Sequence, residues 1–149
     1  MALEPAKRPQ KWESAQRGKV RALLVDEAPD DMSYNSGLLR VLGCEVFMCC
    51  SYGDGVRKLE SEWWDIVVVG QGSPAFEGRR VLERAISIDR KLPVLVLAPF
   101  HDMNCYLEAM QLGAVDYLEQ PVSPCEMRRV LETHARRGFP PLKQATMKR

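Results

Sequence analysis

Five short apolar runs, separated by segments with helical periodicity, constrain the fold of this chain more than any other feature. The runs are Val20–Val25, Cys44–Cys50, Ile66–Val69, Val94–Ala98 and Ala114–Leu118. The third and fourth runs are apolar throughout, which is typical of strands buried on both faces. Strands that alternate with helices favour a parallel sheet with right-handed crossovers. The sequence therefore predicts an α/β fold, a doubly wound five-stranded parallel sheet with helices on both faces.

The segments between these runs carry ordinary helix signals. Pro29 and the aspartates around it suit a loop that starts a helix, and Gly43 ends that helix. A second helix is expected from Val56 to about Glu62, after a turn rich in glycine. Further helices are predicted to begin at Gly78, to run from Asp102 to Leu112, and to run from Ser123 and Pro124 to about Arg137.

The length of 149 residues allows one sizeable core and is too short for two ordinary domains. We expect one domain over residues 19–137, a flexible basic arm over 1–18 and a basic tail over 138–149. No apolar run approaches the roughly 18 to 20 residues of a membrane helix. The N-terminus also lacks the apolar stretch of a signal peptide. We therefore expect a cytoplasmic protein that has no membrane partner.

The net charge of +1 conceals a strong segregation of charge. Residues 1–21 hold six Lys or Arg against two Glu, and residues 128–149 hold seven against one, so the middle of the chain is acidic. Basic ends can attract nucleic acid. Only Trp12 and Phe139 interleave with these charges, and no helix-turn-helix pattern follows. The sequence argues against nucleic-acid binding, and a nucleic-acid-associated regulator acting through its ends remains the alternative, which removal of both ends would test.

The residues at the carboxyl ends of the predicted strands are the candidate site, because doubly wound sheets bind their ligands there. These residues are Asp26, Glu27, Gly70, Ala98, Pro99, Gln120 and Pro121. Gly70 has no side chain and hence no chemistry of its own. The carboxylates of Asp26 and Glu27 offer a weak site for Mg²⁺ or Ca²⁺, and the alternative is that both are simply solvated.

In this order, these residues resemble the receiver domain of bacterial two-component response regulators, over residues 20 to about 136. The motifs that carry the resemblance are Leu24-Val25-Asp26-Glu27, Asp65 to Gly70 with Pro74 and Gly78, Pro93 to Leu97, and Gly113 to Pro121. The resemblance implies a flavodoxin-like sheet order of 2-1-3-4-5. It also implies a signalling role in a phosphorelay and no enzyme activity of the usual kind.

The resemblance also implies that the phosphorylation chemistry of receivers is lost. Receivers carry a phosphoryl group on an aspartate that ends the third strand, with Mg²⁺ held by acidic residues after the first. The acceptor falls on Gly70, the hydroxyl residue on Ala98, the following amide on Pro99, and the lysine on Gln120. Without these groups an acyl phosphate can neither form nor be held. We therefore expect a pseudo-receiver with no catalytic residue and no cofactor beyond weakly bound Mg²⁺ at Asp26 and Glu27.

Two further positions follow from the resemblance. Tyr117 matches the aromatic residue that swings inward in receivers when the hydroxyl residue moves. Because Ala98 has no hydroxyl, Tyr117 should be locked in one rotamer or pack against the fourth helix. The bond between Gln120 and Pro121 matches a peptide bond that is commonly cis in receivers, and X-Pro bonds tolerate that isomer.

The sequence therefore predicts a protein-binding module that acts without phosphorylation. Its expected partners are a histidine kinase, another regulator or an output protein, with a homodimer through the fourth helix, fifth strand and fifth helix as a further expectation. The candidate interface residues are Asp102, Glu108, Tyr117, Arg128, Arg129 and Arg136. A charged, solvated helix face explains the same pattern. A metal-dependent phosphatase would need an Asp-x-Asp loop, which the sequence lacks. In a flavodoxin-like carrier, the acidic loop after the first strand would repel the flavin phosphate.

Overall fold

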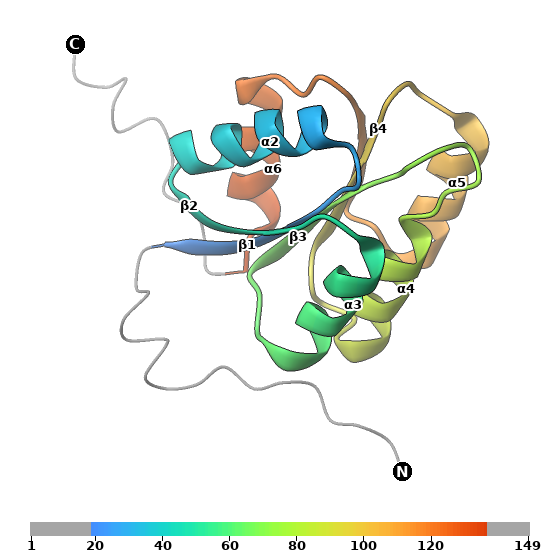
Figure 1. Ribbon diagram of the computed structural model, residues 1–149, viewed down its shortest axis with the longest axis horizontal. Helices are drawn as coiled ribbons and strands as arrows, with labels where there is room; N and C mark the ends of the chain where they lie inside the picture. The colour runs from blue at the N-terminus through green and yellow to red at the C-terminus, as the bar shows by residue number, and fades with distance from the viewer. Residues whose placement is uncertain (1–18, 137–149) are drawn as a thin grey trace.

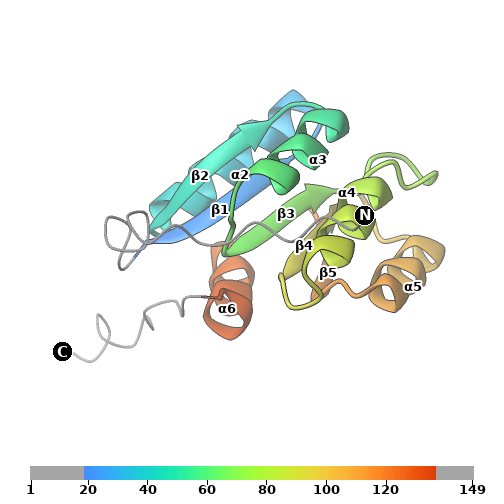
Figure 2. The same ribbon diagram turned by 90° about the horizontal axis from the view of Figure 1, so that it is seen from below.

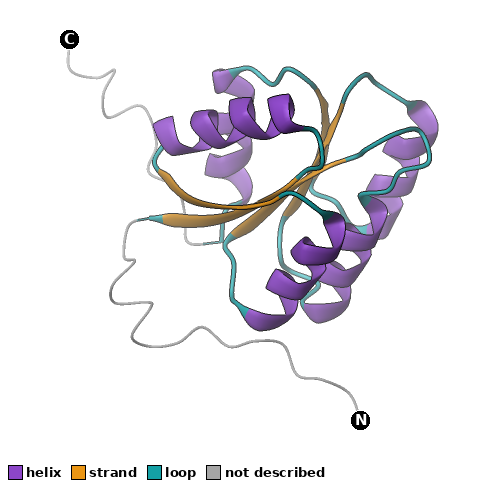
Figure 3. Ribbon diagram, viewed as in Figure 1, coloured by secondary structure: helices purple, strands orange, loops and turns teal. Residues whose placement is uncertain are grey.

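The computed structural model describes residues 19–136, which form a parallel five-stranded sheet between two layers of helices (Figures 1 and 3). The strands are β1 (Val20–Val25), β2 (Cys44–Cys49), β3 (Ile66–Gly70), β4 (Val94–Ala98) and β5 (Asp116–Glu119). The helices are α2 (Pro29–Val41), α3 (Tyr52–Ser61), α4 (Arg79–Ile88), α5 (Met103–Leu112) and α6 (Pro124–His134). The strand order β2-β1-β3-β4-β5 confirms the predicted fold class and the order 2-1-3-4-5.

The predicted arm over residues 1–18 and the predicted tail over 138–149 lie outside the described residues. The predicted alternative, nucleic-acid binding through the two basic ends, therefore concerns residues that the structure does not describe. Among the helices of residues 19–136, none combines the length and the apolar character needed to cross a membrane.

Alternation along the strands gives each face of the sheet its own core. Leu23 and Val67 point toward α3, α4 and α5 and belong to one buried cluster. Leu24 and Val68 point the other way, into a second cluster closed by α2 and α6. Figures 1 and 2 show these two helical layers on opposite sides of the sheet. The central strands are thus buried on both faces, which explains their unbroken apolar sequence.

Helix α3 begins earlier than the sequence predicts, at Tyr52 instead of Val56. The hydroxyl oxygen of Ser51 accepts a hydrogen bond of 3.1 Å from a backbone amide of the first turn, which is an ordinary N-cap. A β-carbon at Gly55 would lie 2.8 Å from a methyl group of Val25. The glycine that suggested a turn is therefore a contact residue that lets α3 approach β1, and the predicted boundary is wrong for that reason.

All neighbouring strands pair in parallel, so their carboxyl ends meet at one edge of the sheet. Asp26 directly follows β1, Gly70 ends β3, Ala98 ends β4 and Gln120 directly follows β5. The order of the strands reverses between β1 and β3, which is where doubly wound sheets bind ligands. The fold therefore gathers the predicted site residues at a single edge.

Candidate functional site

An open pocket of about 400 Å³ lies at this edge of the sheet. Its lining is Asp26, Glu27, Ala28, Asp31, Tyr52, Gly70, Gln71, Gly72, Ser73, Glu77, Leu97, Pro99 and Gln120. Four of these side chains are carboxylic acids, and none is a lysine, arginine or histidine. A phosphoryl group carries a charge of roughly −1.5 to −2 near neutral pH. The lining therefore carries charge of the same sign as a phosphoryl group.

Asp26 and Glu27 lie side by side after β1, and backbone amides already engage both. Asp26 is 5% exposed, its Oδ1 accepts a hydrogen bond of 3.0 Å from the amide of Ala28, and its burial raises the pKa of its carboxyl group. Glu27 is exposed, and its Oε2 accepts a bond of 3.3 Å from the amide of Tyr52. Within residues 19–136, no three His, Cys, Asp or Glu side chains gather as a metal site.

The ends of β3 and β4 contribute almost no polar side chains to the pocket. A β-carbon at Gly70 would lie 2.6 Å from the carboxyl carbon of Asp26, so that carboxyl group occupies the space a side chain would take. The hydroxyl of Tyr52 donates a bond of 3.0 Å to the carbonyl oxygen of Gly70. Ala98 is fully buried, and Pro99 lines the pocket without an N–H to donate. These positions offer neither a nucleophile nor a donor.

Gln120 is held by helix α2. Its Oε1 accepts a hydrogen bond of 3.0 Å from Nδ2 of Asn35, and its Nε2 donates one of 3.3 Å to Oδ2 of Asp31. The Gln120–Pro121 peptide bond is cis. The end of β5 therefore brings a neutral amide, and no positive charge, to the pocket.

Tyr117 of β5 points inward and is 5% exposed. Its hydroxyl donates a short hydrogen bond to Oε1 of Gln71, the residue that directly follows β3. Nε2 of Gln71 in turn donates to the carbonyl oxygen of Ser73, at 3.2 Å. The Tyr117 hydroxyl also accepts a bond of 3.2 Å from the amide of Asp102, and burial raises the pKa of the phenol. The sequence reasoning missed Gln71, because a polar residue in a loop gives no periodic signal.

An exposed apolar stripe lies beside Tyr117, on the outer side of α5. It consists of Phe100, Met103 and Leu107, whose exposed fractions are 54%, 58% and 49%, and we call it the α5 stripe. The rings of His101 and Tyr106 pack edge-on against the Tyr117 ring, with centroids 5.5 and 5.7 Å away. The sequence reasoning followed only the buried side of this helix. The spacing of Met103 and Leu107 could have identified the helical part of the stripe, because positions four apart share a helix face. Phe100 belongs to the loop before α5, so this spacing does not apply to it.

The predicted interface charges are mostly paired within the chain. Asp102 accepts from the amide of Cys105 as the N-cap of α5, Glu108 pairs with Arg79 of α4, Arg128 with Glu132, Arg129 with Asp116 and Arg136 with Asp89. Glu108 and Arg136 thus pair with the two ends of α4, at Arg79 and Asp89. The charges expected to meet a second copy across an interface form ion pairs inside one copy instead.

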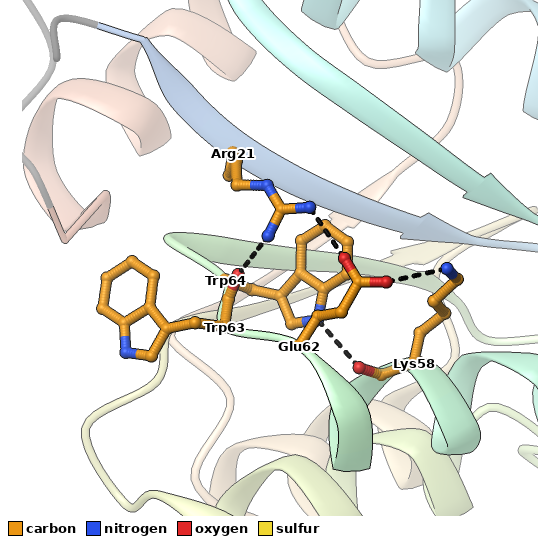
Figure 4. Close-up of polar contacts among 5 residues, drawn as sticks. All are labelled: Arg21, Lys58, Glu62, Trp63 and Trp64. Atoms are coloured by element: carbon orange, nitrogen blue, oxygen red, sulfur yellow. Dashed lines mark hydrogen bonds and ion pairs between the residues drawn. The ribbon is translucent and has the colours of Figure 1, made fainter. Parts of the chain in front are cut away.

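A second polar cluster lies at the opposite, amino-terminal edge of the sheet (Figure 4). The guanidinium group of Arg21 donates to the carbonyl oxygen of Trp63 and to Oε1 of Glu62, each at 2.8 Å. The other oxygen of Glu62 pairs with Nζ of Lys58 at 2.9 Å. The guanidinium also lies 4.4 Å from the ring centroid of Trp64. This Arg21 cluster joins β1 to α3 and β3, and it has no part in the pocket.

A doubly wound sheet of this order, with its pocket at the switch between β1 and β3, defines the flavodoxin-like class. Residues 22–132 match the family model of the response regulator receiver domain. The chain therefore belongs to this family of receiver domains, which serve two-component signalling systems.

Relatives and solved structures agree with this family. The transcriptional regulatory protein ZraR of Salmonella typhimurium is 26% identical over 116 residues, which are 78% of this chain and 26% of ZraR, so the chain spans about a quarter of that relative. A CheY-like receiver from Methanospirillum hungatei superposes with a TM-score of 0.70 at 22% identity, covering 77% of this chain and 92% of that one.

The receiver domain of the sensor histidine kinase PA1611 from Pseudomonas aeruginosa gives a TM-score of 0.69 at 23% identity, covering 78% and 97% of the two chains. That structure holds a magnesium ion coordinated in its active site cleft. At these identities the two superpositions establish the fold and nothing further about this chain.

Proposed function

We propose that this receiver domain signals by binding other proteins, and that it does so without phosphorylation at the end of β3. The observation that carries the proposal is the contact between Gly70 and Asp26. The strand end where receivers hold their acceptor has no side chain, and the Asp26 carboxyl group lies where a β-carbon would be. A phosphoryl group has no atom to bind at this position.

The surrounding chemistry supports the same proposal. Phosphoryl transfer needs a cation and donors that stabilise the charge on the transferred group. The pocket instead presents four carboxylic acids, the neutral amide of Gln120 and the N–H-free Pro99. Asp26 and Glu27 can still attract Mg²⁺, but only weakly, because two carboxylates make an incomplete oxygen cage. Cation binding at this pair would therefore accompany signalling without driving it.

The proposed docking surface is the face formed by α5, β5 and α6. The α5 stripe supports this assignment, because three large exposed apolar side chains on α5 and the loop before it favour contact with a partner. Suitable partners are a histidine kinase, a second regulator, an output protein or a second copy of the chain. We propose this role in place of the charge-matched dimer, because the charges concerned are paired within the chain.

The test combines intact mass and two-dimensional ¹H–¹⁵N NMR of the protein in Mg²⁺, before and after adding acetyl phosphate or beryllofluoride. We expect no change of mass and no movement of the amide signals of Gly70, Ala98 and Tyr117 beyond that caused by Mg²⁺ alone. A receiver that retains an acceptor aspartate serves as the positive control. A stable adduct in this chain, located by fragmentation, would contradict the proposal.

A further inference from the structure

We infer that the side-chain amide of Gln71 fixes Tyr117 permanently in its inward position. In receivers that are phosphorylated, the aromatic residue at this position moves inward only when the phosphate binds. This inference rests on the proposed function only in taking the face beside Tyr117 as the docking surface. It concerns the regulation of that face. The inward position would depend on one side chain of the loop after β3, and neither Mg²⁺ nor a phosphodonor would alter it.

The backbone of Gln71 is fixed independently of its side chain. Its amide donates a hydrogen bond of 2.7 Å to the carbonyl oxygen of Leu97, and its carbonyl oxygen accepts one of 3.0 Å from the amide of Gly78. The side chain is fully buried, and its Nε2 donates to the carbonyl oxygen of Ser73 in the same loop. Its Oε1 accepts from the hydroxyl of Tyr117. The oxygen of the side-chain amide thus binds the tyrosine, while its nitrogen and the main chain hold the loop.

Gln71 also satisfies the only donor of the tyrosine. A phenolic hydroxyl has one hydrogen to donate, and a buried one that lacks an acceptor costs about 1–3 kcal/mol. The Tyr117 hydroxyl gives that hydrogen to Gln71 and accepts a bond from the amide of Asp102. The carbonyl oxygen of Asp102 is the hydroxyl's other acceptor, but at 3.4 Å it is beyond the usual O–H···O distance. Without Gln71 the hydroxyl would keep only that long bond, and it would gain by turning outward to water. The inward rotamer is stable because Gln71 is beside it.

The connection continues from Tyr117 to the α5 stripe. Asp102 is the N-cap of α5, and its Oδ1 accepts a bond of 3.1 Å from the amide of Cys105. Phe100 and Met103, two residues of the stripe, flank Asp102 in the chain. The hydrogen bond from the Asp102 amide to the Tyr117 hydroxyl therefore ties the start of α5, and the stripe residues next to it, to the position of Tyr117. Gln71 is a positioning residue for this surface.

The experiment labels the chain with 3-fluorotyrosine and records ¹⁹F NMR of wild type and Gln71→Met, a variant of similar volume whose thioether sulfur is only a weak acceptor. The four tyrosine signals are assigned by single Tyr→Phe substitutions. In wild type we expect the Tyr117 signal to show almost no solvent isotope shift between H₂O and D₂O, whereas Tyr34, which is 45% exposed, shows a full one. In Gln71→Met the shift at Tyr117 should approach that of Tyr34.

Gln111→Met, an exposed glutamine of α5, is the matched control and should leave the Tyr117 signal unchanged. An unchanged Tyr117 signal in folded Gln71→Met would overturn the inference. If that variant does not fold, Tyr117→Phe decides, because loss of the hydroxyl must move the side-chain amide signals of Gln71, and unmoved signals overturn it equally. Neither measurement uses a partner or a phosphodonor, so their failure is distinct from failure of the proposed function.

Discussion

Asp26 is buried beside two other carboxyl groups, and this affects stability. Burial raises the pKa of Asp26 above its ordinary value of 3.8, and the charges of Asp31 and Glu27 act in the same direction. Between the ordinary pKa and the raised one, the folded protein therefore binds more protons than the unfolded chain. The free energy of unfolding must fall as pH rises through that interval. At neutral pH, Asp26 is a charge that folding disfavours.

We therefore predict that Asp26→Asn stabilises the protein at pH 7 by roughly 0.5–2 kcal/mol, the usual gain from a single stabilising substitution. The amide oxygen can still accept from the amide of Ala28. The gain should shrink as pH falls through the raised pKa and disappear below 3.8, where Asp26 is protonated in both states. Urea denaturation at pH 7 and pH 4.5 measures it. Asp54→Asn is the control, because an arginine contact lowers the pKa of Asp54 and the substitution should not stabilise. A gain independent of pH would contradict the argument.

Gly70→Asp tests the space beside Asp26 from the other side. The new β-carbon must displace the Asp26 carboxyl group, and a further carboxylate in this acidic pocket should cost about 1–3 kcal/mol of stability. Millimolar Mg²⁺ should return much of this loss, because a third carboxylate improves the oxygen cage. Thermal unfolding with and without Mg²⁺ gives the result. An equal Mg²⁺ effect on wild type and variant would show that no third ligand had been gained.

Helix α5 has a buried side and an exposed side with separate roles. Cys105 and Ala109 are buried against the sheet, whereas the α5 stripe faces solvent. Substitutions on the two sides should therefore separate stability from binding. The buried side determines whether the helix packs, and the exposed side determines what it binds.

We predict that Leu107→Glu leaves the free energy of unfolding within about 0.5 kcal/mol of wild type, as exposed substitutions usually do. The same substitution should abolish the weak self-association that we expect for the wild-type chain, because it places a charge in an apolar contact. Sedimentation equilibrium over a concentration series measures the association. Val41→Glu, at a position 84% exposed on α2, is the control. Equal loss in both variants, or a wild type that stays monomeric at every concentration, would reject a dimer through this face.

The sequence predicted the elements better than their contacts. The five strands and the residues at their ends followed from apolar runs, because a strand buried on both faces leaves an unbroken apolar record. The start of α3 did not, because Gly55 serves a close approach to Val25 that only the folded sheet creates. The bond from Tyr117 to Gln71 joins residues 46 positions apart and depends on a rotamer. No local pattern encodes such a contact.

The two edges of the sheet carry different groups. The carboxyl-terminal edge of the sheet carries the acidic pocket, and the amino-terminal edge carries the Arg21 cluster (Figure 4). Both ends of the described chain lie at this second edge, since β1 starts there and the amide of Arg136 donates to the carbonyl oxygen of Asp65, at 3.2 Å. The Arg21 cluster thus stabilises the edge that the chain enters and leaves, well away from the pocket.

We predict that Arg21→Met destabilises the whole domain by about 1–3 kcal/mol, because Glu62 and the carbonyl oxygen of Trp63 lose their buried donor. Methionine retains most of the apolar contact with Trp64, so the loss reports mainly the polar bonds. Guanidinium chloride denaturation measures it. Arg57→Met is the control, since the Arg57 side chain is 75% exposed in its ion pair and such pairs contribute about 0–1 kcal/mol. Equal losses in the two variants would show that burial of Arg21 has no special weight.

The contact between Gln71 and Tyr117 has a consequence for what this domain can tell the cell. If Gln71 fixes Tyr117 as we propose, the docking face has one setting and does not report an event by switching. A partner can then read only how many copies are present and where they are. The signal would then depend on synthesis and degradation of the chain. Its abundance would take the place that the degree of phosphorylation has in other receivers.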